Sequence, residues 1–179
     1  LTGMSQSTTD DSNQFSAFSL DDKPVTVISA YQMREKYGHR WECTAKCGNG
    51  RHEYLELSIS DPGYVCVTAS RSSGRDLLLK TNFPEVLDAP PVRHCDIITL
   101  LRGEFEFDPA VVLHWAILDL DPEFVERAIS AGADLREVVD DGLYPVELVS
   151  AVAASLSEGF QRYFRSGDPS EEVARILKN

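Results

Sequence analysis

The chain has 179 residues, of which 42% are hydrophobic and 26% are charged, a composition typical of globular proteins rather than of disordered or membrane-embedded ones. Lysine and arginine number 17 against 29 aspartates and glutamates, and the resulting net charge of −12 argues against a nucleic-acid-binding protein, which needs clustered bases. Four cysteines are too few for a disulfide scaffold, and neither a signal peptide nor a membrane-spanning apolar run is expected, which predicts a cytoplasmic protein.

Segment 1–24 is polar, rich in serine, threonine and aspartate, and contains few apolar side chains that could be buried. Such a composition predicts a disordered leader over residues 1–24. Residues 1–3 precede Met4, and we expect them to be vector-derived.

Residues 25–103 carry the signals of an antiparallel β meander. A short helix is expected at 31–37, and alternating apolar residues then predict about four strands. These strands are expected at 40–46, 51–60, 64–70 and around 77–79. The dipeptide Asn49-Gly50 accepts the positive φ angles of a tight hairpin and joins the first two strands. The apolar segment 95–101 fits either a strand or a helix.

After residue 108 the hydrophobic period changes to that of helices. Two helices are expected with apolar stripes over 111–116 and 124–129. A third long helix is expected over 145–164, and a last short one over 170–177. Pro145 suits the first position of the long third helix, and Asp168 or Ser170 would cap the last one. Gly132 is expected to end the second helix with a positive φ angle.

The helical half contains two similar segments, in which Leu113 and Val146 occupy equivalent positions. The first contains Leu113-His114-Trp115-Ala116 and Ala131-Gly132-Ala133-Asp134-Leu135, and the second begins at Asp141-Gly142-Leu143-Tyr144-Pro145. This pattern and its spacing resemble the ankyrin-repeat family, whose period is about 33 residues. The resemblance covers residues 108–177 as one regular and one distorted repeat. It implies stacked, L-shaped helix pairs and protein recognition through the β-turn tips and the inner helices.

These signals together predict an α+β protein in which an antiparallel β meander packs on an ankyrin-like stack of helix pairs. We expect a leader at 1–24, a β-rich region at 25–103 and an ankyrin-like helical region at 104–179. Ankyrin arrays usually need three or more repeats to bury a continuous core, so the β-rich region is expected to supply the missing burial.

The negative charge is concentrated in residues 104–147, which hold 12 acidic residues against Arg127 and Arg136. Such a stretch is often only a solvated surface, but it can also accelerate the capture of a basic partner. The candidate partner-binding residues lie at the two ends of the first outer helix: Asp119, Asp121, Glu123, Asp140 and Asp141. The resemblance favours Asp140 and Asp141, because it places them where the β-turn tip would project.

These observations predict a non-enzymatic protein-binding module that needs no cofactor and binds neither nucleic acid nor membranes. A bacterial immunity protein that neutralises a basic toxin would have this size and charge. An alternative is a secretion chaperone that holds an effector and dimerises through the helix expected at 145–164. The oligomeric state stays open.

The chain offers one set of residues of metal-binding type. These residues are Cys43, Cys47, His52 and Cys66. The spacing of the first two matches zinc sites, which keeps a small zinc-binding protein or enzyme as a further alternative. His52 and Cys66 are too widely spaced for the second half of such a site and lie on different expected strands, which favours cysteines that are simply buried in a core.

His94 and Cys95 are a base and a nucleophile by residue type. Adjacent residues seldom direct both side chains at one substrate, and catalytic Cys–His pairs are usually assembled from distant positions. A structural role is therefore expected for both, and no catalytic residue is predicted.

Overall fold

The computed structural model describes residues 18–33, 39–60, 64–71, 74–82, 93–139, 142–155 and 169–179. The chain forms two compact units. One comprises residues 1–89 with 101–106, and the other comprises residues 90–100 with 107–179. Segment 90–100, which was expected in the β-rich region, thus belongs to the helical unit. Within the described residues, no helix is long and apolar enough to cross a membrane.

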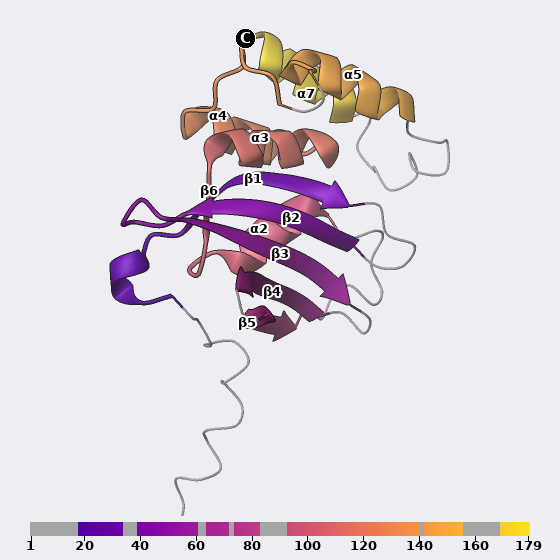
Figure 1. The fold of residues 1–179 in the computed structure, drawn as a ribbon. Coiled ribbons are helices and arrows are strands. Elements are labelled where there is room, and N and C mark those ends of the chain that lie inside the picture. Colours follow the sequence, from indigo (N-terminus) through magenta and orange to yellow (C-terminus); the bar gives the residue numbers. More distant parts are fainter. Residues whose placement is uncertain are drawn as a thin grey trace, which may run out of the picture. The chain divides into compact units, whose positions relative to one another are not determined.

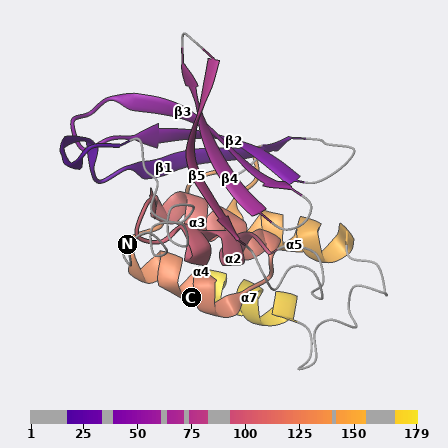
Figure 2. The same ribbon diagram turned by 90° about the horizontal axis from the view of Figure 1, so that it is seen from below.

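The first unit contains an antiparallel meander in which each strand pairs with the next one along the chain (Figure 1). The five strands are β1 (Thr26–Met33), β2 (His39–Lys46), β3 (His52–Ser60), β4 (Tyr64–Arg71) and β5 (Gly74–Asn82). The short β6 (Glu106–Phe107) adds to the edge at β1, where the Glu106 N–H donates to the Val25 carbonyl oxygen at 2.9 Å. The sheet is strongly twisted and curled (Figure 2). This arrangement confirms the expected meander.

Alternation along the strands places one face of the sheet in a core. The buried apolar positions of β2 and β3 are Trp41, Cys43, Ala45, Leu55, Leu57 and Ile59. Cross-strand pairing brings Trp41 opposite Leu57 and Cys43 opposite Leu55, so the two apolar rows lie on the same face. The period-two pattern in the sequence therefore identified this core correctly.

The prediction of a helix at 31–37 is wrong for its first three residues. Tyr31 to Met33 continue β1 and pair antiparallel with residues 40–42 of β2. Residues 34–38 lie outside the described part of the chain. The cross-strand pairing outweighs the local preference of this segment, as is common for strands.

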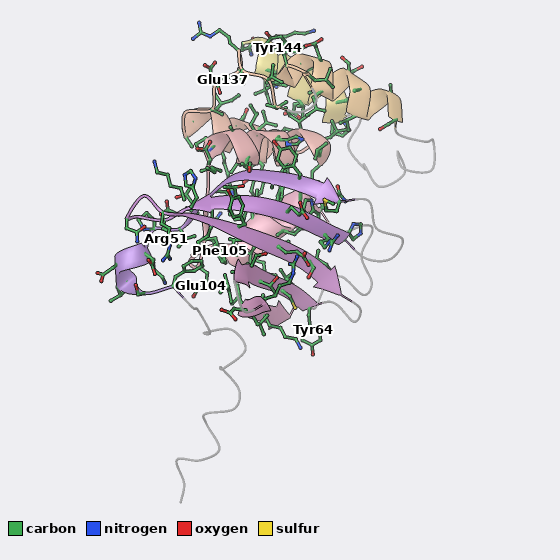
Figure 3. The ribbon with its side chains drawn as sticks, viewed as in Figure 1. Arg51, Tyr64, Glu104, Phe105, Glu137 and Tyr144 are labelled. Carbon is green, nitrogen blue, oxygen red and sulfur yellow. The ribbon has the colours of Figure 1, made fainter. Side chains whose placement is uncertain are left out.

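The prediction of a disordered leader over residues 1–24 is wrong for residues 18–24, which are ordered in the structure. Phe18 is only 7% exposed, and its ring meets the Phe105 ring edge-on at a centroid distance of 6.1 Å. A short 3-10 helix, η2 (Leu20–Asp22), follows, and the Asp22 carbonyl oxygen accepts a hydrogen bond from the Gly48 N–H at 2.6 Å. Figure 3 shows Phe105 on the side of the sheet where η2 lies. Residues 1–17 lie outside the described residues.

The second unit contains five described helices. They are α2 (His94–Leu101, of which residues 94–100 belong to this unit), α3 (Pro109–Leu118), α4 (Pro122–Ser130), α5 (Pro145–Ser155) and α7 (Pro169–Lys178). The segment whose type was open is thus helical. Helix α3 packs against α4 and α5, and α7 packs against α5 and α4.

The two helix pairs after residue 108 share one apolar core. Leu113 of α3, Val125 of α4, Leu148 of α5 and Val173 of α7 are all at most 5% exposed and lie in one cluster. This burial confirms the helical period of the sequence. The long third helix is described only to Ser155, so its expected continuation to 164 lies outside the described residues.

The last helix begins one residue earlier than expected. Pro169 occupies its first position, and Ser170 is buried inside the first turn rather than standing at the N-cap. Proline suits that first position, because its missing N–H would have no helical partner there. Asp168, the other expected cap, lies outside the described residues.

Gly132 has a φ angle of +107° just after α4, as expected for a helix-terminating glycine. A Cβ atom added there meets nothing within 4 Å, so a substitution costs conformational energy alone. We expect Gly132→Val to lower the free energy of unfolding by about 1–2 kcal/mol, measured by urea denaturation. The matched control is Ala131→Val, because Ala131 is exposed and has a φ angle of −81°. Equal losses in the two variants would contradict the conformational explanation.

Candidate functional site

A connected polar cluster of the helical unit surrounds Asp119, directly after α3. Its carboxylate accepts hydrogen bonds from the backbone N–H groups of His94 at 3.1 Å and Cys95 at 2.8 Å. The His94 Nδ1 atom lies 2.8 Å from the same carboxylate, whose side chain is 5% exposed. Asp119 therefore holds the start of α2 against the end of α3.

The electrostatics of this cluster oppose nucleophilic catalysis. Burial alone would raise the pKa of Asp119, but hydrogen bonds from His94 and Cys95 outweigh it and lower the pKa. Burial, followed by the nearby Asp119 charge, raises the pKa of the Cys95 thiol, which keeps the thiol protonated at neutral pH. A reactive cysteine requires the opposite shift. His94 and Cys95 thus fit the expected structural role.

The candidate binding residues near the α3–α4 turn differ in their surroundings. Asp121 accepts a hydrogen bond from the Phe124 N–H at 3.1 Å, which caps α4, and also forms an ion pair with Arg93. Asp119 and Asp121 are thus both engaged within the unit. The Glu123 side chain is 71% exposed and pairs with Arg127 at 2.6 Å. Of these three carboxylates, Glu123 is the most accessible to a partner.

Asp140 and Asp141, the candidate residues at the tip, lie outside the described residues. The flanking segment is described. The Val139 N–H donates to the Leu143 carbonyl oxygen at 2.9 Å, which ties together the two sides of this connection between α4 and α5.

Exposed apolar side chains gather in the same connection. Val138 is 50% exposed, Tyr144 is 48% exposed and Val146 is 36% exposed. Figure 3 shows Glu137 and Tyr144 on the same side of the helical unit. We call residues 134–147 the hairpin tip. Sequence reasoning missed its apolar component, although an aromatic residue at position 144, where ankyrin repeats have threonine, was the available signal.

The four residues considered for zinc are not brought together. Cys43 and Cys47 are buried, whereas Cys66 alternates with the buried residues of β4 and faces the other side of the sheet. No group of three or more His, Cys, Asp or Glu side chains that could hold a metal ion occurs in the described residues. Burial first, and the neighbouring Glu42 second, raise the pKa of Cys43 to about 12, as expected for a cysteine packed in a core.

A second surface feature lies on the β unit. A hollow of about 350 Å³ opens among residues that alternate with the buried positions of β1–β5. Its polar lining consists of Tyr31, Glu42, Thr44, Tyr54, Glu56, Ser70 and Arg75. The two tyrosines are each 66% exposed. The sequence contained only a weak signal for this hollow. That signal was the presence of tyrosines at strand positions that alternate with the buried ones and therefore face solvent.

These two surfaces, the hairpin tip and the hollow, are the features of the described residues that suit recognition. Comparison with known proteins found no matching protein-family model, no matching curated protein and no matching solved structure.

Proposed function

We propose that this chain is a non-enzymatic protein-binding module that captures a basic protein through its hairpin tip. The observation that carries the proposal is the exposure of Val138, Tyr144 and Val146 in a connection that also bears exposed carboxylates. Among the described residues of this segment, the exposed acidic ones are Asp134, Glu137 and Glu147. Apolar anchors within a charged surround are the usual composition of a protein-recognition surface.

The arrangement of the helices supports the choice of the tip. Helix α3 packs on α5 and α4 packs on α7, so equivalent helices of the two pairs are neighbours. This packing supports the ankyrin resemblance, under which the connection between α4 and α5 would be a recognition tip. The resemblance and the exposed side chains thus favour the same segment.

The charge distribution supports a basic partner. Residues 104–147 carry 12 acidic residues and two arginines, and the described caps engage only some of these carboxylates. A concentrated negative field raises the rate at which a positively charged protein is captured. An immunity protein that neutralises a basic toxin needs such rapid capture, and we propose this as the biological role.

Affinity capture from the native host tests the proposal. The full chain serves as bait, and retained proteins are identified and ranked by charge; a basic protein should be retained. A tip variant, Glu137→Lys with Tyr144→Ala, should lose it. The control is Glu126→Lys with Leu20→Ala, which combines the same charge reversal with truncation of another exposed apolar side chain, both outside the tip, and should retain the partner. Equal retention by both variants, or no basic protein on the wild-type chain, would refute the proposal.

The two aspartates at the centre of the tip supply a kinetic prediction. We expect Asp140→Lys with Asp141→Lys to slow association with the captured partner about tenfold at low salt, because steering by several like charges is lost. Gly142 stays unchanged, since its φ angle of +82° is needed in the turn. Biolayer interferometry at two salt concentrations measures the effect. Unchanged kinetics in the folded variant, or salt-insensitive binding by the wild type, would exclude the tip as the steering surface.

A further inference from the structure

We infer that the hollow on the β unit binds an arginine side chain of a protein partner, held between Tyr31 and Tyr54 and paired with Glu42. The inference rests on the proposed function, in that the occupant belongs to a basic protein. Three observations support it: the register of the strands, the state of the carboxylates and the exposure of the aromatic rings.

The strand register brings these side chains onto one surface. Tyr31 of β1 is the direct cross-strand partner of Glu42 on β2, and Glu42 is in turn opposite Glu56 on β3. Tyr54 is opposite Thr44, which places it diagonally next to Glu42. Direct and diagonal cross-strand neighbours lie within reach of long side chains. Glu42 is therefore flanked by an aromatic residue on each neighbouring strand.

The two carboxylates of the hollow differ in their partners. Glu56 accepts a hydrogen bond from Arg40 at 3.3 Å and forms an ion pair with Arg75 at 2.6 Å, so its charge is compensated within the unit. The Glu42 side chain is exposed, and its carboxylate makes no hydrogen bond or ion pair with any other described residue. Glu42 is thus the carboxylate available to a cation from outside.

The aromatic rings are equally available. Elsewhere the chain covers aromatic faces with its own cations, as Lys80 Nζ does 4.5 Å from the centroid of the Tyr64 ring. Tyr31 and Tyr54 have no such cover among the described residues, and both are 66% exposed. Aromatic faces attract cations, most often guanidinium groups.

The chemistry of the hollow favours arginine over other cations. A planar guanidinium stacks on an aromatic ring and can donate two hydrogen bonds to one carboxylate, which an ammonium group cannot do. The volume of about 350 Å³ is near the lower end of ligand pockets, which span roughly 300–1,000 Å³, and suits a single side chain.

Nuclear magnetic resonance titration of the full chain tests this site with N-acetyl-arginine amide as the probe. N-acetyl-citrulline amide, which has nearly the same shape but no charge, is the control ligand. The arginine probe should shift the resonances of Tyr31, Glu42 and Tyr54 saturably, and the citrulline probe should not. Equal shifts with both probes, or shifts confined to other residues, would overturn the inference.

Matched variants separate this site from a general charge effect. Glu42→Gln should weaken binding of the arginine probe about fivefold or more, as should Tyr31→Ala. Glu106→Gln removes one charge at another exposed position of the same unit and should leave binding unchanged. If Glu42→Gln and Glu106→Gln weakened binding of the arginine probe equally, the assignment of the site to the hollow would be wrong.

The same variants distinguish this inference from the proposed function. If the arginine probe fails to bind but the wild-type chain and Glu42→Gln both capture the basic partner from lysate, the hollow is not the site and the hairpin-tip proposal stands. If the probe binds as expected but no basic protein is captured, the hollow recognises arginine and the proposed function is wrong.

Discussion

Replacing Asp119 with alanine is expected to lower the free energy of unfolding of the helical unit by about 3–5 kcal/mol. The change removes the acceptor of the His94 and Cys95 N–H groups, at 3.1 and 2.8 Å, and also the partner of the His94 ring. All of these groups lie in a largely buried position, where lost hydrogen bonds are not replaced fully by water. Urea denaturation followed by circular dichroism measures the loss.

Asp108→Ala is the matched control for this prediction. Asp108 caps α3 with a single exposed hydrogen bond to the Ala110 N–H at 2.9 Å, so its removal should cost about 1 kcal/mol. Losses of equal size at positions 108 and 119 would show that Asp119 is only another helix cap, and would contradict the role assigned to the cluster.

The lowered pKa of Asp119 also predicts how stability depends on pH. Because the folded-state pKa lies below the unfolded-state value, the ionised carboxylate contributes its full stabilisation above the unfolded-state pKa. That contribution is lost as the pH falls through the folded-state pKa. Asp119→Asn cannot lose it, so the stability difference between wild type and variant should shrink on acidification. A difference that stays constant down to the acid transition would contradict this assignment.

Gly48→Ala is expected to destabilise the β unit by about 2–3 kcal/mol, an overpacking effect. A Cβ atom at this position would lie 2.8 Å from the carbonyl carbon of Lys23 and closer still to its oxygen. Both are backbone atoms, and the segment is held by the Gly48 hydrogen bond to Asp22 and by the Arg51–Asp22 ion pair at 3.2 Å. The clash therefore cannot be relieved by a side-chain rotation, and the η2 segment must move.

Gly50→Ala in the same turn separates this clash from backbone strain. Gly50 has a φ angle of +88°, but a Cβ atom there would meet nothing within 4 Å. Gly50→Ala should lower the free energy of unfolding by about 1 kcal/mol, because alanine is strained in the left-handed conformation. Thermal unfolding of both variants gives the comparison, and a Gly50 loss as large as that at Gly48 would refute the steric explanation.

The strands that the sequence predicts and the one that it misses differ for a physical reason. Along β2 and β3 the apolar residues alternate without interruption, so the buried face can be read directly. In β1 the register shifts between Val27 and Ser29, and the buried residues are Val27 and then Ala30. A bulge of this kind interrupts the period of two and hides the strand from pattern analysis.

The functional surfaces were less predictable than the core, because they depend on pairings distant in sequence. The role of Asp119 requires α2 to begin beside the end of α3, although Cys95 and Asp119 are far apart along the chain. The hollow requires the register of β1, β2 and β3 to align Tyr31, Glu42 and Tyr54, and turn lengths fix that register. Composition alone located the acidic segment, but it could not tell capping carboxylates from accessible ones.

Hydrogen–deuterium exchange of the chain, alone and with its captured partner, is the most direct test of the central claim. Recognition through the hairpin tip predicts slower exchange of backbone amides in residues 134–147 when the partner is bound, because the partner excludes water there. Protection confined to the β unit, with the exchange of residues 134–147 unchanged, would contradict it.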